Sequence, residues 1–213
     1  MRWKTPFGGF VICAALTVSG CLYLDVRLAE FVSEKAGYGF LFSESVSNLP
    51  DLLFLMVCII TVVSWTGRLY KAGKPAKGRI LNFLEHMGLA VPVAFVLKEL
   101  LKELFGRTNT RVWLLHPDRL GFHWFHGGGD FASFPSGHMA VFTVLVLGVC
   151  RYFPRLRAVC AGLLFVLALA LIVTQYHFFS DIAAGACLGV VVDWLTWRGL
   201  AYFHDSNNLK AKS

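Results

Sequence analysis

Charged residues are scarce in this sequence. Only 15% of its 213 residues are Asp, Glu, Lys or Arg, whereas soluble domains carry about 25%. Hydrophobic residues make up 56% of the chain, and the mean hydropathy is +0.61. A soluble domain of this length would need more polar surface than the chain supplies. The composition therefore excludes an ordinary soluble protein and predicts an integral membrane protein with one domain, residues 1–213.

Cys-x-x-Cys spacings are missing as well. All six cysteines lie inside apolar stretches, where they suit neither a disulfide framework nor a zinc site. We interpret them as small apolar side chains. No cluster of carboxylates indicates a required metal ion, so we expect neither a metal nor another cofactor. The cysteines are Cys13, Cys21, Cys58, Cys150, Cys160 and Cys187.

Long apolar segments, in contrast, are abundant. A membrane-spanning helix needs about 20 mostly apolar residues, and six segments approach that requirement. They predict an all-α, polytopic membrane protein built as a bundle of six transmembrane helices. The third segment contains His86 and Pro92, and the sixth contains Asp193. The predicted spans are residues 7–24, 50–66, 80–101, 138–153, 158–176 and 182–203.

Basic residues are distributed unevenly between the predicted loops. With the N-terminus in the cytoplasm, most of the 20 Lys and Arg fall on the cytoplasmic side, as the positive-inside rule favours. We therefore predict a multi-pass protein of the bacterial inner membrane with both termini cytoplasmic. Residues 25–49, expected to form an interfacial or re-entrant helix, would lie outside with residues 103–137 and 177–181. The net charge of +7 suits anionic membrane lipids and requires no nucleic-acid partner.

The N-terminus allows a competing interpretation. Arg2 and Lys4 followed by an apolar run also resemble a signal peptide, and VSGC, ending at Cys21, resembles a lipoprotein cleavage site. Cleavage there would leave the orientation of the other five predicted helices unchanged.

Three polar clusters fall on the side predicted to face outside. The first is KELLKELFGRTNTR, in which Lys98 and Lys102 are four residues apart and share one helical face. Arg107 and Arg111 follow the predicted end of that helix. Alternatively, the lysines only extend to the membrane surface and pair with the neighbouring glutamates.

The second cluster is SFPSGH, at the start of an apolar helix. Pro135 suits a first helical turn, which Ser136 or Ser133 could cap. The free N–H groups and the positive dipole end of such a turn form an anion site, and Gly137 lets an anion approach the backbone closely. His138 would then lie within one turn of the anion, although the same residues also fit an ordinary helix start.

The third cluster is YHFFSDIAAG, in which His177 and Asp181 are four residues apart. An Asp that accepts a hydrogen bond from one ring nitrogen fixes the histidine tautomer and leaves the other nitrogen basic or nucleophilic. The simpler alternative is an interfacial histidine beside an N-capping Asp.

Together the three clusters predict phosphate chemistry. Lys and Arg side chains and backbone N–H groups would bind a phosphate and neutralise its developing charge. One histidine, with its Asp partner, would attack phosphorus, and the second would give a proton to the leaving oxygen. Such a reaction needs no metal ion.

Residues 95–190 resemble the type-2 phosphatidic acid phosphatase family, the membrane lipid phosphatases related to vanadium haloperoxidases. PSGH, ending at His138, and His177-x-x-x-Asp181 carry the resemblance. It implies a six-helix bundle and metal-independent hydrolysis through a phosphohistidine intermediate. It also implies that His177 is the nucleophile, that Asp181 orients it, and that His138 is the general acid.

The cations of the family motifs are matched only in part. The Arg-Pro of the first motif falls on Asn109 and Thr110, and the Arg expected before the last motif falls on Leu171. Nearby cations on the predicted outer side are the substitutes. The predicted phosphate-binding residues are Ser136, Gly137, Lys98, Lys102, Arg107 and Arg111.

The expected substrate is a lipid phosphate in the membrane. Undecaprenyl pyrophosphate, phosphatidylglycerol phosphate, phosphatidate and phosphorylated lipid A all fit this description. Two other functions stay open at this point. One is phosphotransfer from one lipid to another, and the other is a non-catalytic binder or transporter of anions or lipid phosphates.

Overall fold

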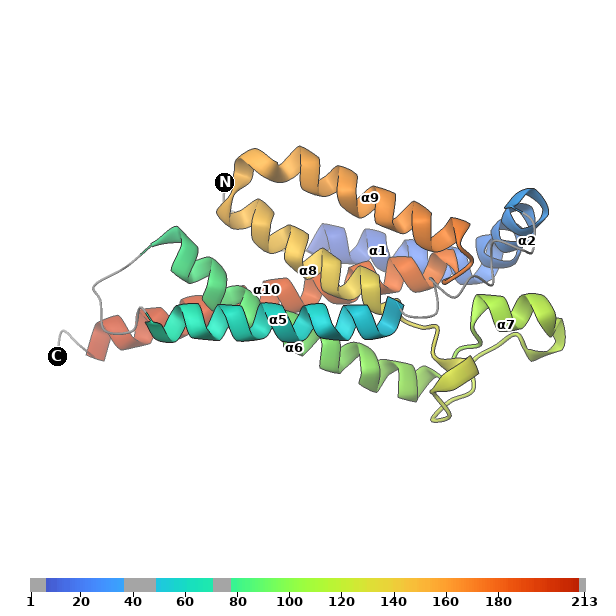
Figure 1. Ribbon diagram of the computed structural model, residues 1–213, viewed down its shortest axis with the longest axis horizontal. Helices are drawn as coiled ribbons and strands as arrows, with labels where there is room; N and C mark the ends of the chain where they lie inside the picture. The colour runs from blue at the N-terminus through green and yellow to red at the C-terminus, as the bar shows by residue number, and fades with distance from the viewer. Residues whose placement is uncertain (1–6, 37–48, 71–77, 211–213) are drawn as a thin grey trace.

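The computed structural model describes residues 7–36, 49–70 and 78–210, and within them every regular element is a helix (Figure 1). Helices α1 and α2 are joined by the π-helical turn η1 into one continuous helical segment. Short 3-10 turns lie in the loops between the long helices. The elements are α1 Phe7–Ser19, η1 Gly20–Leu24, α2 Asp25–Ala36, α5 Leu49–Tyr70, α6 Arg79–Phe105, α7 Thr110–Leu115, η2 Pro117–Arg119, η3 Gly129–Phe131, α8 Gly137–Tyr152, η4 Pro154–Leu156, α9 Arg157–Val173 and α10 Phe179–Lys210.

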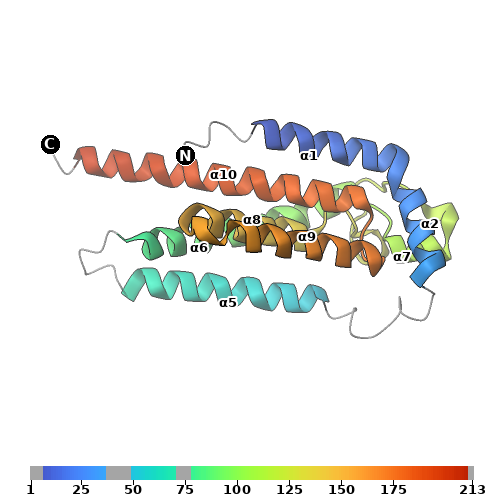
Figure 2. The ribbon, with the colours of Figure 1, turned by 90° about the horizontal axis from the view of Figure 1, so that it is seen from above.

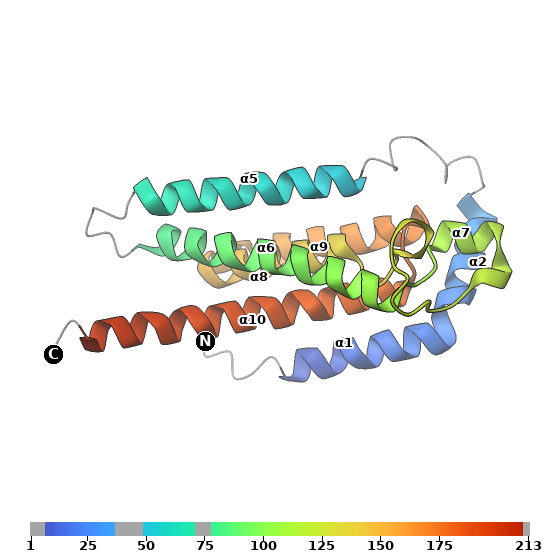
Figure 3. The ribbon, with the colours of Figure 1, turned by 90° about the horizontal axis from the view of Figure 1, so that it is seen from below.

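The long helices lie side by side along the long axis of the molecule (Figure 2). Helices α6, α8 and α10 contact one another at the centre, while α5 packs on α6, α1 on α10 and α9 on α8. Helix α2 turns away from α1, and α2, α7 and the loops around α7 gather at one end of the bundle (Figure 3). Many large apolar side chains on α5 and α9 are exposed, as expected of surfaces that face lipid.

Five helical segments are long and apolar enough to cross a membrane: Gly8–Lys35, Leu52–Tyr70, Arg79–Phe105, Pro154–Val173 and Phe179–His204. They overlap five of the six predicted spans. The remaining prediction, 138–153, coincides with α8, which is an apolar helix of 16 residues and is shorter than the roughly 20 residues that a span requires. The first span is longer than predicted because the helical segment continues through η1 into α2. Of the interfacial or re-entrant helix predicted at residues 25–49, residues 25–36 form helix α2, and residues 37–48 lie outside the described residues.

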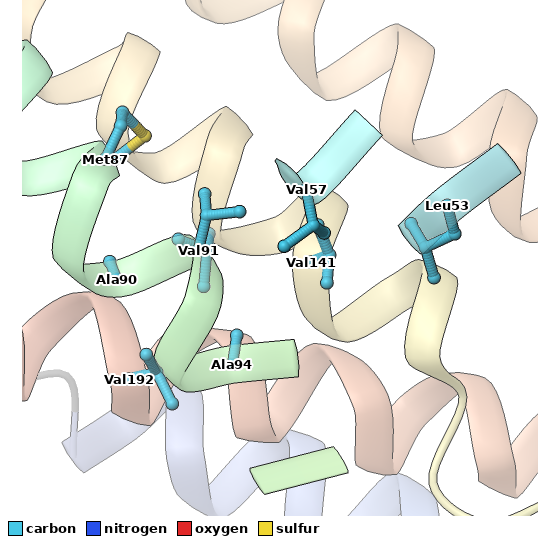
Figure 4. Packing of buried hydrophobic residues seen from close by; sticks show 9 residues of the cluster. Leu53, Val57, Met87, Ala90, Val91, Ala94, Val141 and Val192 are labelled. Carbon is cyan, nitrogen blue, oxygen red and sulfur yellow. The ribbon is translucent and has the colours of Figure 1, made fainter. Parts of the chain in front are cut away.

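The core between the central helices is built from small and medium-sized side chains (Figure 4). Contact between helices in lipid depends on close approach, which small residues permit. A Cβ on Gly185 of α10 would lie 2.4 Å from the Ser136 carbonyl oxygen, and one on Gly189 would lie 2.6 Å from the Thr143 Cβ. Glycine at these two positions therefore lets the start of α10 lie directly against the start of α8.

A buried polar cluster joins the same three helices at the opposite end of α8. His86 Nε2 on α6 lies 3.3 Å from Asp193 Oδ1 on α10, and Arg151 on α8 donates a hydrogen bond to Asp193 Oδ2. Charged groups inside a membrane protein are normally paired in this way. The polar residues that interrupt the third and sixth predicted spans thus face each other. The six cysteines are all free, as predicted.

The predicted orientation can be tested by cysteine labelling. We expect a membrane-impermeant thiol reagent to label Asp118→Cys, in the exposed η2 turn, in intact cells. Arg155→Cys, exposed on η4, should be labelled only after permeabilisation, because the positive-inside rule places it in the cytoplasm. The parent protein measures labelling of the natural cysteines. The reverse pattern would show that the predicted topology is inverted.

Candidate active site

The predicted site residues converge at the end of the bundle that carries α7 (Figure 3). This end contains the end of α6, the start of α8, the segment after α9 and the start of α10. Backbone contacts hold these ends together: Ser136 N–H donates to the Asp181 carbonyl oxygen at 3.0 Å, and Ser133 N–H donates to the Arg107 carbonyl oxygen at 3.1 Å. Two sequence motifs separated by about 40 residues therefore share one site.

Gly106 determines how the chain leaves α6. It adopts the left-handed conformation, with φ 52° and ψ 47°, and its N–H donates to the Lys102 carbonyl oxygen. A Cβ at this position would lie 1.9 Å from the His123 carbonyl oxygen. Only glycine fits this C-cap without strain. The turn directs the next residue, Arg107, into the interior.

His177 is held by two acceptors on the same side of its ring. Its Nδ1 lies 3.4 Å from Ser133 Oγ and 3.6 Å from Asp181 Oδ2. The Ser133 hydroxyl donates to Asp181 Oδ2 at 2.6 Å, and the Phe178 N–H donates to the same oxygen at 3.0 Å. These acceptors assign the ring proton to Nδ1 and leave Nε2 with its lone pair.

Asp181 therefore combines the two roles that the sequence left open. It lies beside the His177 ring, as the catalytic interpretation requires. It also accepts the N–H of Phe178, the residue before α10, as the third residue of a helix does in a capping box. Its side chain is fully buried, so both contacts form away from water.

The electrostatic surroundings keep His177 neutral. Burial lowers the pKa of His177 below its ordinary value of 6.5, and the positive charge of Lys102 lowers this pKa further, whereas the neighbouring Asp181 carboxylate raises it. A neutral imidazole at neutral pH retains the nitrogen lone pair that a nucleophile needs.

The second predicted histidine lies close to the first. The ring centroids of His138 and His177 are 6.5 Å apart, and the ring of Tyr176 packs edge-on against both. His138 belongs to the first turn of α8, whereas His177 precedes α10. The site therefore places one imidazole on α8 and the other in the segment before α10, close to each other, which suits attack on one side of a phosphate and protonation on the other.

The start of α8 is the segment for which the sequence predicts an anion site. Ser136 is the N-cap, and its side chain accepts from the Met139 N–H. Pro135 precedes this cap and is not in the first turn, while Ser133 contacts Asp181 instead. These two details differ from the sequence prediction because α8 begins at Gly137, two residues after the proline.

Lys98 lies directly against this helix start. It is only 4% exposed, and a Cβ on Gly137 would lie 3.3 Å from its Nζ. Its ammonium group also contacts the Glu99 carboxylate and the face of the Phe95 ring. Glycine at position 137 thus leaves room for a cation beside the free N–H groups of α8.

Arg107 is engaged by carboxylates. Its Nη1 donates to Asp181 Oδ1 and its Nη2 to Asp25 Oδ2, both at 2.6 Å. Burial disfavours the charged guanidinium, but Asp181 and Asp25 outweigh this effect and raise the pKa of Arg107 above its usual value. Arg107 is thus a permanent cation within the site. Both of its terminal nitrogens contact protein groups.

Arg111 lies at the border of the site. Its Nε and Nη2 both donate to the Thr174 carbonyl oxygen, at 3.3 and 2.9 Å, and its guanidinium lies over the Tyr176 ring at 5.5 Å. Leu171, where the motif resemblance predicted an arginine, is buried in an apolar cluster with Met139 and Ile182. The structure thus brings Arg111 to the segment that lacks its own cation.

Asp25 and Tyr176 contact the site although neither was predicted to belong to it, and Ser133 was predicted only as a possible helix cap. A carboxylate at the end of an apolar helix, as Asp25 is, is the signal that could have indicated it. Within residues 7–36, 49–70 and 78–210, no group of three or more His, Cys, Asp or Glu side chains is placed to hold a metal ion.

Fold and site define an all-helical membrane protein with a buried histidine–aspartate pair, a second histidine and several cations at the helix ends. Residues 83–205 match the family model of the PAP2 superfamily, and the chain belongs to that superfamily. This confirms the resemblance predicted from the motifs.

One solved structure shows the same fold. It is the crystal structure of the first transmembrane PAP2-type phosphatidylglycerolphosphate phosphatase from Bacillus subtilis, with a TM-score of 0.53 and 17% sequence identity. The match covers 92% of this chain and 96% of that chain. No curated protein matches the sequence. Family and fold together support a membrane phosphatase.

Proposed function

We propose that this protein hydrolyses the phosphate ester or pyrophosphate of a membrane lipid on the outer face of the membrane, without a metal ion. The observation that carries the proposal is the pair of imidazoles, His177 and His138, with ring centroids 6.5 Å apart. The first is buried beside a carboxylate, and the second lies in a helix start that is suited to an anion.

In the first step, the Nε2 lone pair of His177 attacks phosphorus, and the bond between phosphorus and the lipid oxygen breaks. The departing oxygen takes a proton from the protonated His138. Asp181 stabilises the charge that develops on the His177 ring. Lys98, Lys102 and the N–H groups at Gly137 stabilise the charge on the phosphoryl oxygens.

In the second step, His138 takes a proton from a water molecule, and the resulting hydroxide attacks phosphorus. The N–P bond breaks, its electrons return to His177, and inorganic phosphate leaves. The proton taken from water leaves His138 protonated, as it was before the first step. One water molecule is consumed, and the site is restored.

Release of phosphate and a trapped intermediate test this proposal. With ³²P-labelled phosphatidate in proteoliposomes, we expect labelled inorganic phosphate to form in the presence of a chelator. An alkaline quench during turnover should leave label on the protein, because N-phosphohistidine survives alkali and not acid. The peptide that contains residue 177 should carry the label.

Other outcomes would identify the alternatives. Label transferred to a second lipid, with none released into water, would identify a phosphotransferase. Phosphate binding without turnover, unchanged after loss of His177, would identify a non-catalytic binder or transporter. A strict requirement for Mg²⁺ would contradict the metal-independent mechanism.

A further inference from the structure

Helix α2 holds the catalytic segment from both sides of His177. Asp25, its first residue, accepts the Ser180 N–H with Oδ1 at 2.9 Å. One turn further along α2, the Ala29 carbonyl oxygen accepts a hydrogen bond from the Gln175 side chain, also at 2.9 Å. Gln175 lies two residues before His177 and Ser180 lies three residues after it. Asp25 and His177 also line the same small cavity.

Asp25 is the last of a series of interacting charged side chains, Asp181, Arg107 and Asp25, that starts beside His177. Asp181 Oδ2 faces His177, and Asp181 Oδ1 accepts from Arg107 Nη1. The other terminal nitrogen of Arg107 donates to Asp25 Oδ2. The Ser180 hydroxyl closes the arrangement, because it accepts from Arg107 and donates to Asp25. Three elements far apart in sequence are joined in this way.

The surroundings of Arg107 leave it little freedom to move. It is 4% exposed, and its guanidinium lies over the rings of Phe178 at 4.8 Å and Phe122 at 5.1 Å. A planar guanidinium with both nitrogens engaged has one preferred orientation. Removing either carboxylate would release it to rotate toward the other.

We infer that Asp25 is a positioning residue of the proposed reaction: it holds Arg107 in the orientation that fixes Asp181 beside His177. The inference rests on the proposed function. Asp25 bonds to Arg107 and to Ser180, and Arg107 in turn bonds to Asp181, so Asp25 acts through Arg107. Asp25 also lies outside residues 83–205, which match the family model. The inference therefore gives the N-terminal helices a part in the proposed reaction.

Asp25→Asn tests the inference, because the amide has the same shape and still accepts the Ser180 N–H but has no charge. We expect kcat to fall about tenfold to a hundredfold, as is usual for residues that orient a reactive group without touching the substrate. The KM for labelled phosphatidate should stay close to the parent value, because Asp25 does not contact phosphate. Glu30→Gln, an exposed carboxylate on the same helix, is the matched control and should keep parental kcat and KM.

A double-mutant cycle with Arg107→Lys separates positioning from simple helix capping. A lysine lacks the planar fork by which Arg107 reaches Asp181 and Asp25 from two separate nitrogens, so Asp25→Asn should lower kcat less than twofold further in that background. Fully multiplicative effects would show that Asp25 only caps α10, and parental kcat in Asp25→Asn would also overturn the inference. If Asp25→Asn fails to fold, Ser180→Ala, which removes the bridging hydroxyl, must show the same selective loss of kcat. Absence of hydrolysis by the parent would instead overturn the proposed function.

Discussion

His177→Ala should abolish turnover on every substrate, with a loss of at least about 10³-fold in kcat, because the proposed intermediate cannot form without the nucleophile. The neighbouring imidazole, His138, does not replace His177, because it is needed as the proposed general acid. Inorganic phosphate release from a labelled lipid, at matched expression, measures the effect. Asp181→Asn should cost less than His177→Ala, because it disturbs the tautomer and leaves the nucleophile in place.

The leaving group distinguishes the two histidines. His138→Ala should impair hydrolysis of an alkyl phosphate strongly and that of a nitrophenyl phosphate weakly, because a good leaving group needs no proton. His177→Ala should be inactive on both. His204→Ala, at the far end of α10, controls for the loss of any histidine. Parental turnover in His177→Ala would rule out the mechanism.

Most of the fold follows from local patterns in the sequence. Each apolar run forms a helix, because in lipid its backbone N–H and C=O groups must hydrogen-bond to one another within the segment. The patterns did not reveal that α1 continues into α2, because the mixed polarity of residues 25–36 favours neither a span nor a loop. They also left open whether α8, with 16 residues, spans the membrane.

The site was predictable where function lies in short motifs, as in PSGH and His177-x-x-x-Asp181. The partners of Arg107 were not, because they depend on contacts across the whole chain. Arg107 and Asp25 are 82 residues apart, and Asp25 and Ser180 are 155 residues apart. Neither the periodicity nor the motif spacing of the sequence indicates such pairs. From the sequence, Arg107 was predicted only to bind phosphate, and that role stays a prediction.

Arg111→Ala should lower kcat/KM about 10²-fold, which is the usual cost of removing one fixed donor that stabilises the transition state. Asn109 and Leu171 stand where the motif resemblance predicted arginines, and both residues have other contacts in the structure. Asn109 caps α7 and accepts the Arg111 N–H, while Leu171 packs in the apolar core. The cap thus starts the short helix that carries Arg111 to the Tyr176 ring, which contacts both histidines.

The Arg111 variants distinguish a phosphate ligand from a structural clamp on Thr174. Arg111→Lys keeps the charge but loses the fork, so it should be clearly impaired, yet less than Arg111→Ala. A phosphate ligand predicts that inhibition by vanadate weakens in parallel with kcat/KM, whereas a clamp predicts a lower melting temperature with unchanged vanadate affinity. Arg119→Ala, an exposed arginine on the η2 turn, is the matched control and should behave as the parent. Parental activity in Arg111→Ala with an inactive Arg119→Ala would show that compensation for the missing arginines comes from elsewhere in the loop.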